Sequence, residues 1–117
     1  MSPQQAEQFA QNWMAAWNAH DLDQVLALYH DEFSMASPYI AAIAGESSGS
    51  LHGKPAVRAD WQAALARMPE LHFELIDCLC GVNSLVLYYR SVGGKLAAEY
   101  FDFDNQGKVI RAAAHYR

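Results

Sequence analysis

The sequence has few cysteines, few basic residues and no long hydrophobic run. Its two cysteines, Cys78 and Cys80, stand two positions apart. On a strand they point the same way and are poorly placed to form a disulfide with each other, which favours a reducing cytoplasm. No apolar stretch approaches the roughly 20 residues that span a bilayer, and the N-terminus lacks the basic and apolar regions of a signal peptide. We therefore expect a cytoplasmic protein without membrane association.

The charge balance and the motifs exclude further classes of partner. Eight Lys and Arg residues stand against 13 Asp and Glu residues, for a formal net charge of −5. No basic run is long enough to neutralise several phosphates, which argues against a nucleic-acid partner. The spacings HxH, HExxH and CxxC are absent, so we expect no metal site, and no phosphate-binding loop or other cofactor motif is present. The length of 117 residues, 52% of them apolar, predicts one domain with a substantial core.

Residues 2–68 have the pattern of three helices with a short strand between the second and the third. Ser2-Pro3 has the composition of a helix start, a capping residue followed by proline. Phe9, Trp13 and Trp17 then recur every four residues, which predicts one wide apolar face.

The remaining elements of this half are shorter. Asp21 is predicted to cap a second helix that includes Tyr29, and residues 33–36 alternate like a short strand. A third helix is expected over residues 53–68. The intervening residues 39–52, rich in Gly and Ser, are interpreted as a loop. Residues 40–50 are expected to be mobile, and the apolar start of the loop is expected to fold over a pocket as a lid.

The second half has the pattern of an antiparallel meander. Strands are predicted at residues 72–80, 84–92, 95–104 and 108–116, with Gly93-Gly94 as a hairpin turn. Helices followed by a meander indicate an α+β fold, in which helices cover one face of a curved sheet.

The expected register places one acid in an apolar interior. If Gly93-Gly94 is the whole hairpin loop, Glu99 pairs with Tyr88, and a loop at 104–107 then brings Ala112 beside Glu99. A different loop length would turn a strand over, because side chains alternate with period two. On this register Glu99 shares its face with Val86, Tyr88, Phe101, Ile110, Ala112, Ala114 and Tyr116.

Three segments resemble a known family. They are "WMAAWNAHDLDQVLALYHDEFSMASP" at residues 13–38, "HGKPAVRADW" at 52–61 and "YFDFDNQGKVIRAAAHY" at 100–116. Together they resemble the SnoaL-like and ketosteroid-isomerase-like branch of the nuclear transport factor 2 superfamily. The resemblance implies one such domain over residues 1–117. Its fold would be a cone-shaped α+β barrel, with three N-terminal helices packed on a strongly bent, mostly antiparallel sheet around a pocket. Members of this branch include isomerases, cyclases, dehydratases, epoxide hydrolases and non-catalytic modules, so the fold does not decide the function.

The resemblance carries over only part of the isomerase machinery. The position of the carboxylate base is Ser37, whose hydroxyl cannot replace a carboxylate unaided. The position at which the isomerases have an enolate-binding Tyr is occupied here by Trp13, whose indole N–H can only donate a hydrogen bond. Glu99 takes the place of the buried second acid. Ketosteroid isomerisation is therefore not expected, although the resemblance still implies a pocket.

Two functional hypotheses follow. The first is a cofactor-free isomerase, cyclase or dehydratase acting on a small hydrophobic molecule, with Glu99 as acid or base and Tyr88 beside it. The alternative is a non-catalytic ligand-binding or dimerisation module, in which Glu99 makes a structural contact with Arg90. Burial is expected to raise the pKa of Glu99. The expected substrate-binding residues are Trp13, Trp17, Tyr29, Met35, Ser37, Tyr39, Trp61, Phe101, Ala112 and Tyr116.

A homodimer is also expected. Both faces of the strand predicted at residues 72–80 carry apolar side chains, whereas helices can cover only one face of the sheet. We therefore expect the outer face of the sheet to contact a second copy of the chain.

Overall fold

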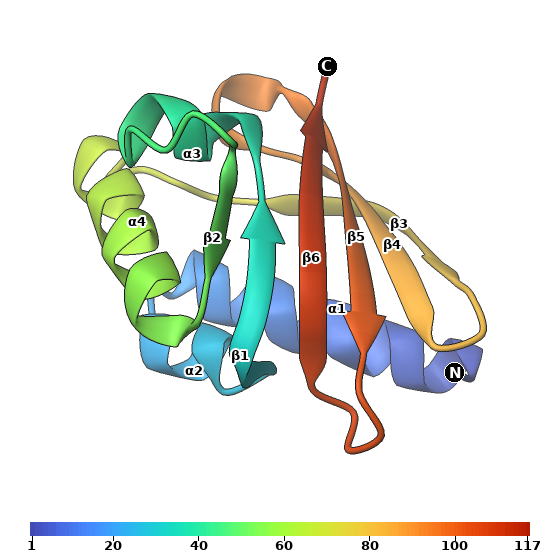
Figure 1. Ribbon diagram of the computed structural model, residues 1–117. Helices are drawn as coiled ribbons and strands as arrows, with labels where there is room; N and C mark the ends of the chain where they lie inside the picture. Colours follow the sequence, from blue (N-terminus) through green and yellow to red (C-terminus); the bar gives the residue numbers. More distant parts are fainter.

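The computed structural model describes residues 1–117, and its framework is a curved six-stranded sheet with the long helix α1 packed behind it (Figure 1). No helix is both long enough and apolar enough to cross a membrane. In chain order the elements are α1 (Pro3–Asn18), α2 (Leu22–Leu26), β1 (Tyr29–Ala36), α3 (Pro38–Ile43), β2 (Ser50–His52), α4 (Lys54–Arg67), β3 (Glu74–Cys80), β4 (Ser84–Arg90), the 3-10 turn η1 (Val92–Gly94), β5 (Leu96–Phe103) and β6 (Val109–Tyr116).

The start of α1 follows from its first residues. The Ser2 hydroxyl accepts a hydrogen bond from the Gln5 N–H, and the Gln5 side chain accepts one from the Ser2 N–H, which together form a capping box. The predicted apolar face is confirmed, since Phe9, Trp13 and Trp17 are all buried against the sheet. This face supplies one wall of the interior.

The second helix is shorter than expected. It ends at Leu26, and Tyr29 is the first residue of β1 rather than part of a helix. The Leu28 N–H donates to the Val25 carbonyl, and the Val109 N–H donates to the Leu28 carbonyl. The chain therefore leaves the helix and pairs with β6 at once.

The interpretation of residues 39–52 as one loop is wrong. Ser37 caps α3 by accepting a hydrogen bond from the Tyr39 N–H, and Pro38 takes the first helical position. Ser50–His52 then forms β2, which pairs with β1. The fold therefore has four helices rather than the three expected, and residues 44–49 alone remain a connecting loop.

The α+β class and the curved, mostly antiparallel sheet are confirmed. The strand order is β2-β1-β6-β5-β4-β3, and only β1 and β6 run parallel. The two edge strands β2 and β3 do not pair with each other, so the sheet stays open and the term barrel describes its curvature rather than a closed ring.

The predicted register between β4 and β5 is wrong by one residue. The connection is not two residues but the five residues 91–95, closed by the Ser91 N–H donating to the Lys95 carbonyl at 2.6 Å. Glu99 therefore pairs with Leu87, and Tyr88 pairs with Ala98 on the other face. The one-residue difference reverses the alternation of β4, which turns Tyr88 outward.

The register between β5 and β6 keeps the expected faces over most of its length. Glu99 pairs with Ala114 and Phe101 with Ala112, a shift of two residues that leaves the inward set unchanged. An irregularity after Asp102 then places Val109 in the core, where Ile110 was expected.

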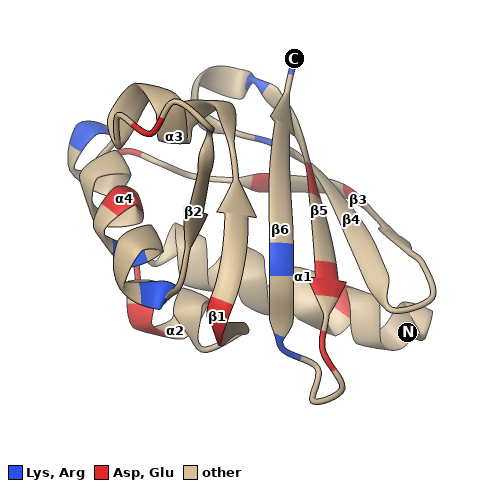
Figure 2. Ribbon diagram, viewed as in Figure 1, with Lys and Arg blue, Asp and Glu red and all other residues tan.

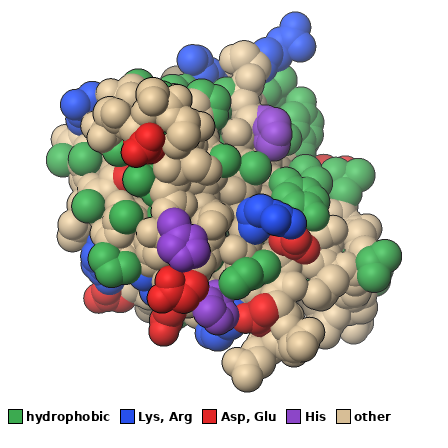
Figure 3. Space-filling model, viewed as in Figure 1, with side chains coloured by type: hydrophobic (Ala, Val, Ile, Leu, Met, Phe, Trp, Pro, Cys, Tyr) green, Lys and Arg blue, Asp and Glu red, His purple; other side chains and the backbone are tan.

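The outer face of the sheet carries a row of apolar residues that no helix covers. Leu79, Val86, Tyr100 and Ala113 are paired neighbours across β3, β4, β5 and β6, and we call them the outer row. Leu79 is 58% exposed and Tyr100 37% exposed. In the space-filling view, hydrophobic side chains gather over β5 and β4 (Figure 3), while Figure 2 marks the charged positions along the strands.

We propose that a second copy of the chain covers the outer row. Of the acidic and basic side chains two positions from the row, Arg111 and Asp102 form an ion pair at 2.8 Å, and Asp77 on β3 is a single carboxylate without an ion pair. A two-fold axis through the sheet would bring the same apolar row of two copies together.

Sedimentation equilibrium at micromolar concentration should give about twice the chain mass of 13.0 kDa. Tyr100→Glu, which places a charge in the outer row, should shift the mass toward the monomer. Val82→Glu introduces the same charge on the exposed β3–β4 turn and should leave the mass unchanged. A monomeric wild-type chain would contradict the proposal.

Candidate active site

A cavity of about 410 Å³ lies between the inner face of the sheet and the helices α3 and α4, within the range of pockets that bind small molecules. Fourteen of its 20 lining residues are hydrophobic, so it suits an apolar ligand. The lining residues are Trp13, Trp17, Met35, Ser37, Tyr39, Ala42, Ile43, Asp60, Trp61, Ala64, Arg67, Met68, Leu71, Phe73, Tyr89, Ser91, Val92, Lys95, Glu99 and Tyr116.

Packed aromatic rings form the inner wall of this cavity. Trp13 stacks on Phe73 with ring centroids 5.5 Å apart, and Trp17 meets Trp61 edge to face at 5.0 Å. The Trp13 indole N–H donates to the Tyr29 hydroxyl at 3.0 Å. Because Trp13 already has this partner, its N–H is not free to hold a ligand oxygen.

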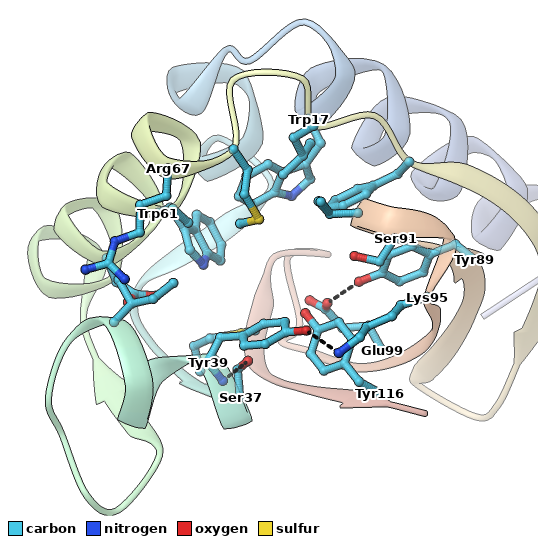
Figure 4. Close-up of a pocket in the computed structure, with 18 of the residues that line it drawn as sticks. Trp17, Ser37, Tyr39, Trp61, Arg67, Tyr89, Ser91, Lys95, Glu99 and Tyr116 are labelled. Carbon is cyan, nitrogen blue, oxygen red and sulfur yellow. Dashed lines mark hydrogen bonds between the residues drawn. The ribbon is translucent and has the colours of Figure 1, made fainter.

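Glu99 lies on the sheet side of the cavity and is only 3% exposed. The Tyr89 hydroxyl donates to Oε1 of Glu99 at 3.1 Å (Figure 4). No hydrogen bond or ion pair engages Oε2, and no basic side chain lies within ion-pair distance of this carboxyl group. Arg90, the alternative structural partner, is exposed and bonds to the Gly94 carbonyl instead.

The environment of Glu99 perturbs several ionisable groups. Burial raises the pKa of Glu99 to about 7, while the Tyr89 hydrogen bond opposes the rise. Burial and, second, the Glu99 charge raise the pKa values of Tyr29, Tyr89 and Tyr116. The three phenols therefore stay protonated near neutral pH and surround one carboxyl group that is partly ionised.

The mouth of the cavity is formed by α3 and the β4–β5 connection. Tyr39 and Tyr116 lie with ring centroids 4.6 Å apart, and the Lys95 ammonium donates to the Tyr39 hydroxyl at 3.5 Å. Arg67, on α4, lies on the other side of the opening (Figure 4). The two exposed charged residues that line the cavity are thus both basic, although the chain is acidic.

The structure brings most of the predicted site residues together. The cavity lining includes Glu99, Trp13, Trp17, Met35, Ser37, Tyr39, Trp61 and Tyr116. Tyr29, Phe101 and Ala112 are buried in the core behind this lining instead. Tyr88, expected beside Glu99, lies on the outer face because of the changed register, and Tyr89 takes the predicted place.

Several polar lining residues were missed by the sequence analysis. Asp60 lies three residues after Val57 and directly before Trp61, so the helical period already places it on the inward face of α4. Ser91 and Lys95 belong to the five-residue connection that was taken for part of two strands. No sequence signal distinguishes them there.

The chain belongs to the SnoaL-like domain family, whose model matches residues 10–117. Among solved structures it is similar to a SnoaL-like protein of unknown function from Burkholderia thailandensis. The identity is 49%, over 99% of this chain and 97% of that one, with a TM-score of 0.96. No curated protein matches in sequence.

More distant structures share the fold alone. A candidate isomerase of the SnoaL-like family from Agrobacterium tumefaciens is 15% identical over 97% of this chain and 98% of that one, with a TM-score of 0.77. An NTF2-like protein of unknown function from Burkholderia pseudomallei is 18% identical over 100% and 92% of the chains, with a TM-score of 0.76. The expected resemblance to the nuclear transport factor 2 superfamily is confirmed at the level of fold.

The raised pKa of Glu99 predicts a pH-dependent stability. The folded chain holds the proton up to about pH 7, whereas the unfolded chain releases it near its ordinary pKa of about 4.3. The contribution of protonated Glu99 to the free energy of unfolding is therefore present at low pH and is lost as the pH rises toward 7 and beyond.

Glu99→Gln should remove this dependence. From pH 5 to pH 8 the wild type should lose roughly 2–3 kcal/mol of unfolding free energy relative to the variant. Urea unfolding of both proteins at the two pH values measures the difference, and all other titrations are common to both. If the difference in unfolding free energy between the wild type and Glu99→Gln did not change with pH, the buried, neutral state of this carboxyl group would be contradicted.

Proposed function

We propose that the protein is an acid–base enzyme that moves a proton on a small apolar carbonyl compound, with Glu99 as the proton carrier. The observation that carries this proposal is one buried carboxyl group, with a pKa of about 7, in an apolar cavity. A group that titrates near the working pH is well suited to both accept and donate a proton. Isomerisation, cyclisation and dehydration all require such a step.

The residues supply each part of the step. Ionised Glu99 takes a proton from the carbon next to the carbonyl at Oε2, the C–H electron pair moves into an enolate, and the protonated carboxyl group returns the proton. Tyr89 holds Oε1 and fixes the carboxyl group. Tyr116 lines the same part of the cavity and remains protonated. Its O–H is thus a donor for the developing enolate oxygen.

The candidate isomerase from Agrobacterium tumefaciens has the same fold, which agrees with the proposed class but does not specify a substrate. The most similar of the structures compared above, from Burkholderia thailandensis, has no known function. The proposal therefore depends on the site itself.

One observation favours the alternative, a ligand-binding module without turnover. Ser37, at the position of the isomerase base, caps α3 through its hydrogen bond from the Tyr39 N–H. A residue used as a helix cap contributes to local stability rather than to proton transfer. Glu99 therefore has no second carboxylate beside it at the position of Ser37 to act as a base.

Deuterium exchange tests the proposed function directly. We expect the wild type to exchange the α-protons of 1-tetralone, a small apolar ketone, in D₂O faster than buffer does. Glu99→Gln should reduce the protein-dependent rate by 10²-fold or more, since positioned acid–base groups contribute about 10²–10⁴-fold. Proton NMR follows the loss of the α-proton signal. Binding of 1-tetralone without any exchange would support the binding module instead.

A matched pair of tyrosine variants tests the role of Tyr89. Its hydrogen bond lowers the pKa of Glu99, so Tyr89→Phe should raise that pKa and move the midpoint of the exchange rate to higher pH. Tyr88→Phe makes the same change one residue away, on the outer face. It should leave the midpoint where it is. Equal pH profiles for Tyr89→Phe and the wild type would contradict the assigned contact.

A further inference from the structure

Two basic side chains belong to the lining of a largely apolar cavity. They are Lys95, at the end of the β4–β5 connection, and Arg67, the last residue of α4. Neither takes part in an ion pair, whereas Lys54, Arg58 and Arg111 all have acidic partners. Because both charges are free of acidic partners, they are available to a ligand that carries an anionic group.

The backbone holds Lys95 at the mouth of the cavity. The Ser91 N–H donates to the Lys95 carbonyl at 2.6 Å, and the Lys95 N–H donates to the Val92 carbonyl at 3.5 Å. The side chain extends to α3, where its ammonium group donates to the Tyr39 hydroxyl at 3.5 Å (Figure 4). The Arg67 side chain makes no hydrogen bond to another lining residue. Lys95 is therefore the cation whose charged group has a defined place in the lining.

A continuous series of contacts joins Lys95 to Glu99 along one wall of the cavity. The Tyr39 ring packs on the Tyr116 ring with centroids 4.6 Å apart. Tyr116 lies near Glu99, because burial and, second, the Glu99 charge raise the pKa of Tyr116. The Tyr89 hydroxyl then donates to Glu99. Lys95 is exposed and Glu99 is 3% exposed, so this wall has a cation at its outer end and a buried acid at its inner end.

The carboxyl groups in the lining leave the Lys95 charge unneutralised. Neither Glu99 nor Asp60 lies within ion-pair distance of it. Burial raises the pKa of Glu99 to about 7, so this group is only partly ionised near neutral pH and repels a second anion less than a fully charged acid would. An anion bound at exposed Lys95 also stays in contact with water, which avoids the high cost of burying a charge.

We propose that the ligand of the cavity is an apolar keto acid, whose carboxylate binds the Lys95 ammonium group and the Tyr39 hydroxyl while its carbonyl end reaches Glu99. The inference rests on the proposed function, because the carbonyl end is assigned to Glu99. The ammonium group donates to the carboxylate, and the Tyr39 hydroxyl, which donates to no other group of the protein, supplies a second donor. One ammonium group matches the single charge of a carboxylate better than the larger charge of a phosphate group.

A keto acid and its amide test this proposal. Isothermal titration measures the affinities of 4-benzoylbutyrate and 4-benzoylbutyramide, which have nearly the same size and shape but differ in charge. Their flexible chain lets the terminal group reach the mouth while the ketone lies inside. We expect the acid to bind the wild type about fivefold more tightly, the upper range for an exposed ion pair. This preference should shrink as the salt concentration rises, whereas the affinity of the amide should change little.

Variants of the two basic residues locate the effect. Lys95→Gln should bring the ratio of the two affinities close to one, and Lys95→Arg, which keeps the charge, should retain the preference for the acid. Arg67→Gln is the matched control, since it removes a positive charge from the same lining but from α4. It should preserve the ratio, whatever it does to the absolute affinities. Both side chains are exposed, and circular dichroism melting checks that each variant is folded.

The outcomes separate this inference from the proposed function. Equal affinities of the wild type for the acid and the amide, an unchanged ratio in Lys95→Gln, or an equal loss in Arg67→Gln would overturn the carboxylate site. Exchange of 1-tetralone, which has no carboxylate, reports on Glu99 independently of that site. A preference that depends on Lys95, together with exchange that is independent of Glu99, would support the carboxylate site and overturn the catalytic proposal. If neither the acid nor the amide bound, the carboxylate site and the apolar carbonyl class would be overturned together.

Discussion

The burial of one carboxyl group without a cation is the constraint on which the site depends. Glu99 is enclosed by Leu87 and Ala114 on the neighbouring strands and by Tyr89, and its only hydrogen bond comes from a neutral phenol. Such a group destabilises the folded chain when it ionises. The core that offsets this cost is a cluster of 27 buried residues, rich in aromatic rings from α1 and the sheet. The stability of the aromatic packing thus offsets the cost of burying this carboxyl group.

The sequence analysis found this group because two kinds of periodicity agreed. The helical period of Phe9, Trp13 and Trp17 identified the face that covers the sheet, and the alternation of β5 against the alanines of β6 placed Glu99 beneath it. The error at Tyr88 arose from the length of one connection. Gly93 and Gly94 both adopt positive φ, as a tight hairpin would require, but they lie within a five-residue turn rather than form a two-residue one. Composition alone does not separate the two geometries, and the difference of one residue in register turns the whole strand over.

The helix α3 illustrates a different failure. Ser37-Pro38 has the same capping residue and proline that correctly marked the start of α1 at Ser2-Pro3. The Gly- and Ser-rich stretch that follows α3 outweighed this local signal, so the segment was interpreted as a loop. The position of Tyr39 over the cavity follows from that cap, because the Tyr39 N–H is the donor to Ser37. The indole Nε1 of Trp17 and the carboxyl Oδ1 of Asp60 have no hydrogen-bond partner in the protein, and nothing in the sequence indicated this, since it depends on how α1 and α4 pack in three dimensions.

The distribution of acids in the cavity limits the chemistry that the site supports. Its two carboxyl groups come from different sides: Glu99 has a phenol donor, whereas Asp60 has no basic partner and an orphaned oxygen. With a helix cap at Ser37, the proposed chemistry has Glu99 alone to take the proton and to return it, and therefore to the same face of the substrate. This geometry fits proton shifts and eliminations in which removal and delivery share one face. Reactions that need two acids on opposite faces of one reacting centre would require Asp60, on α4, to act as the second acid.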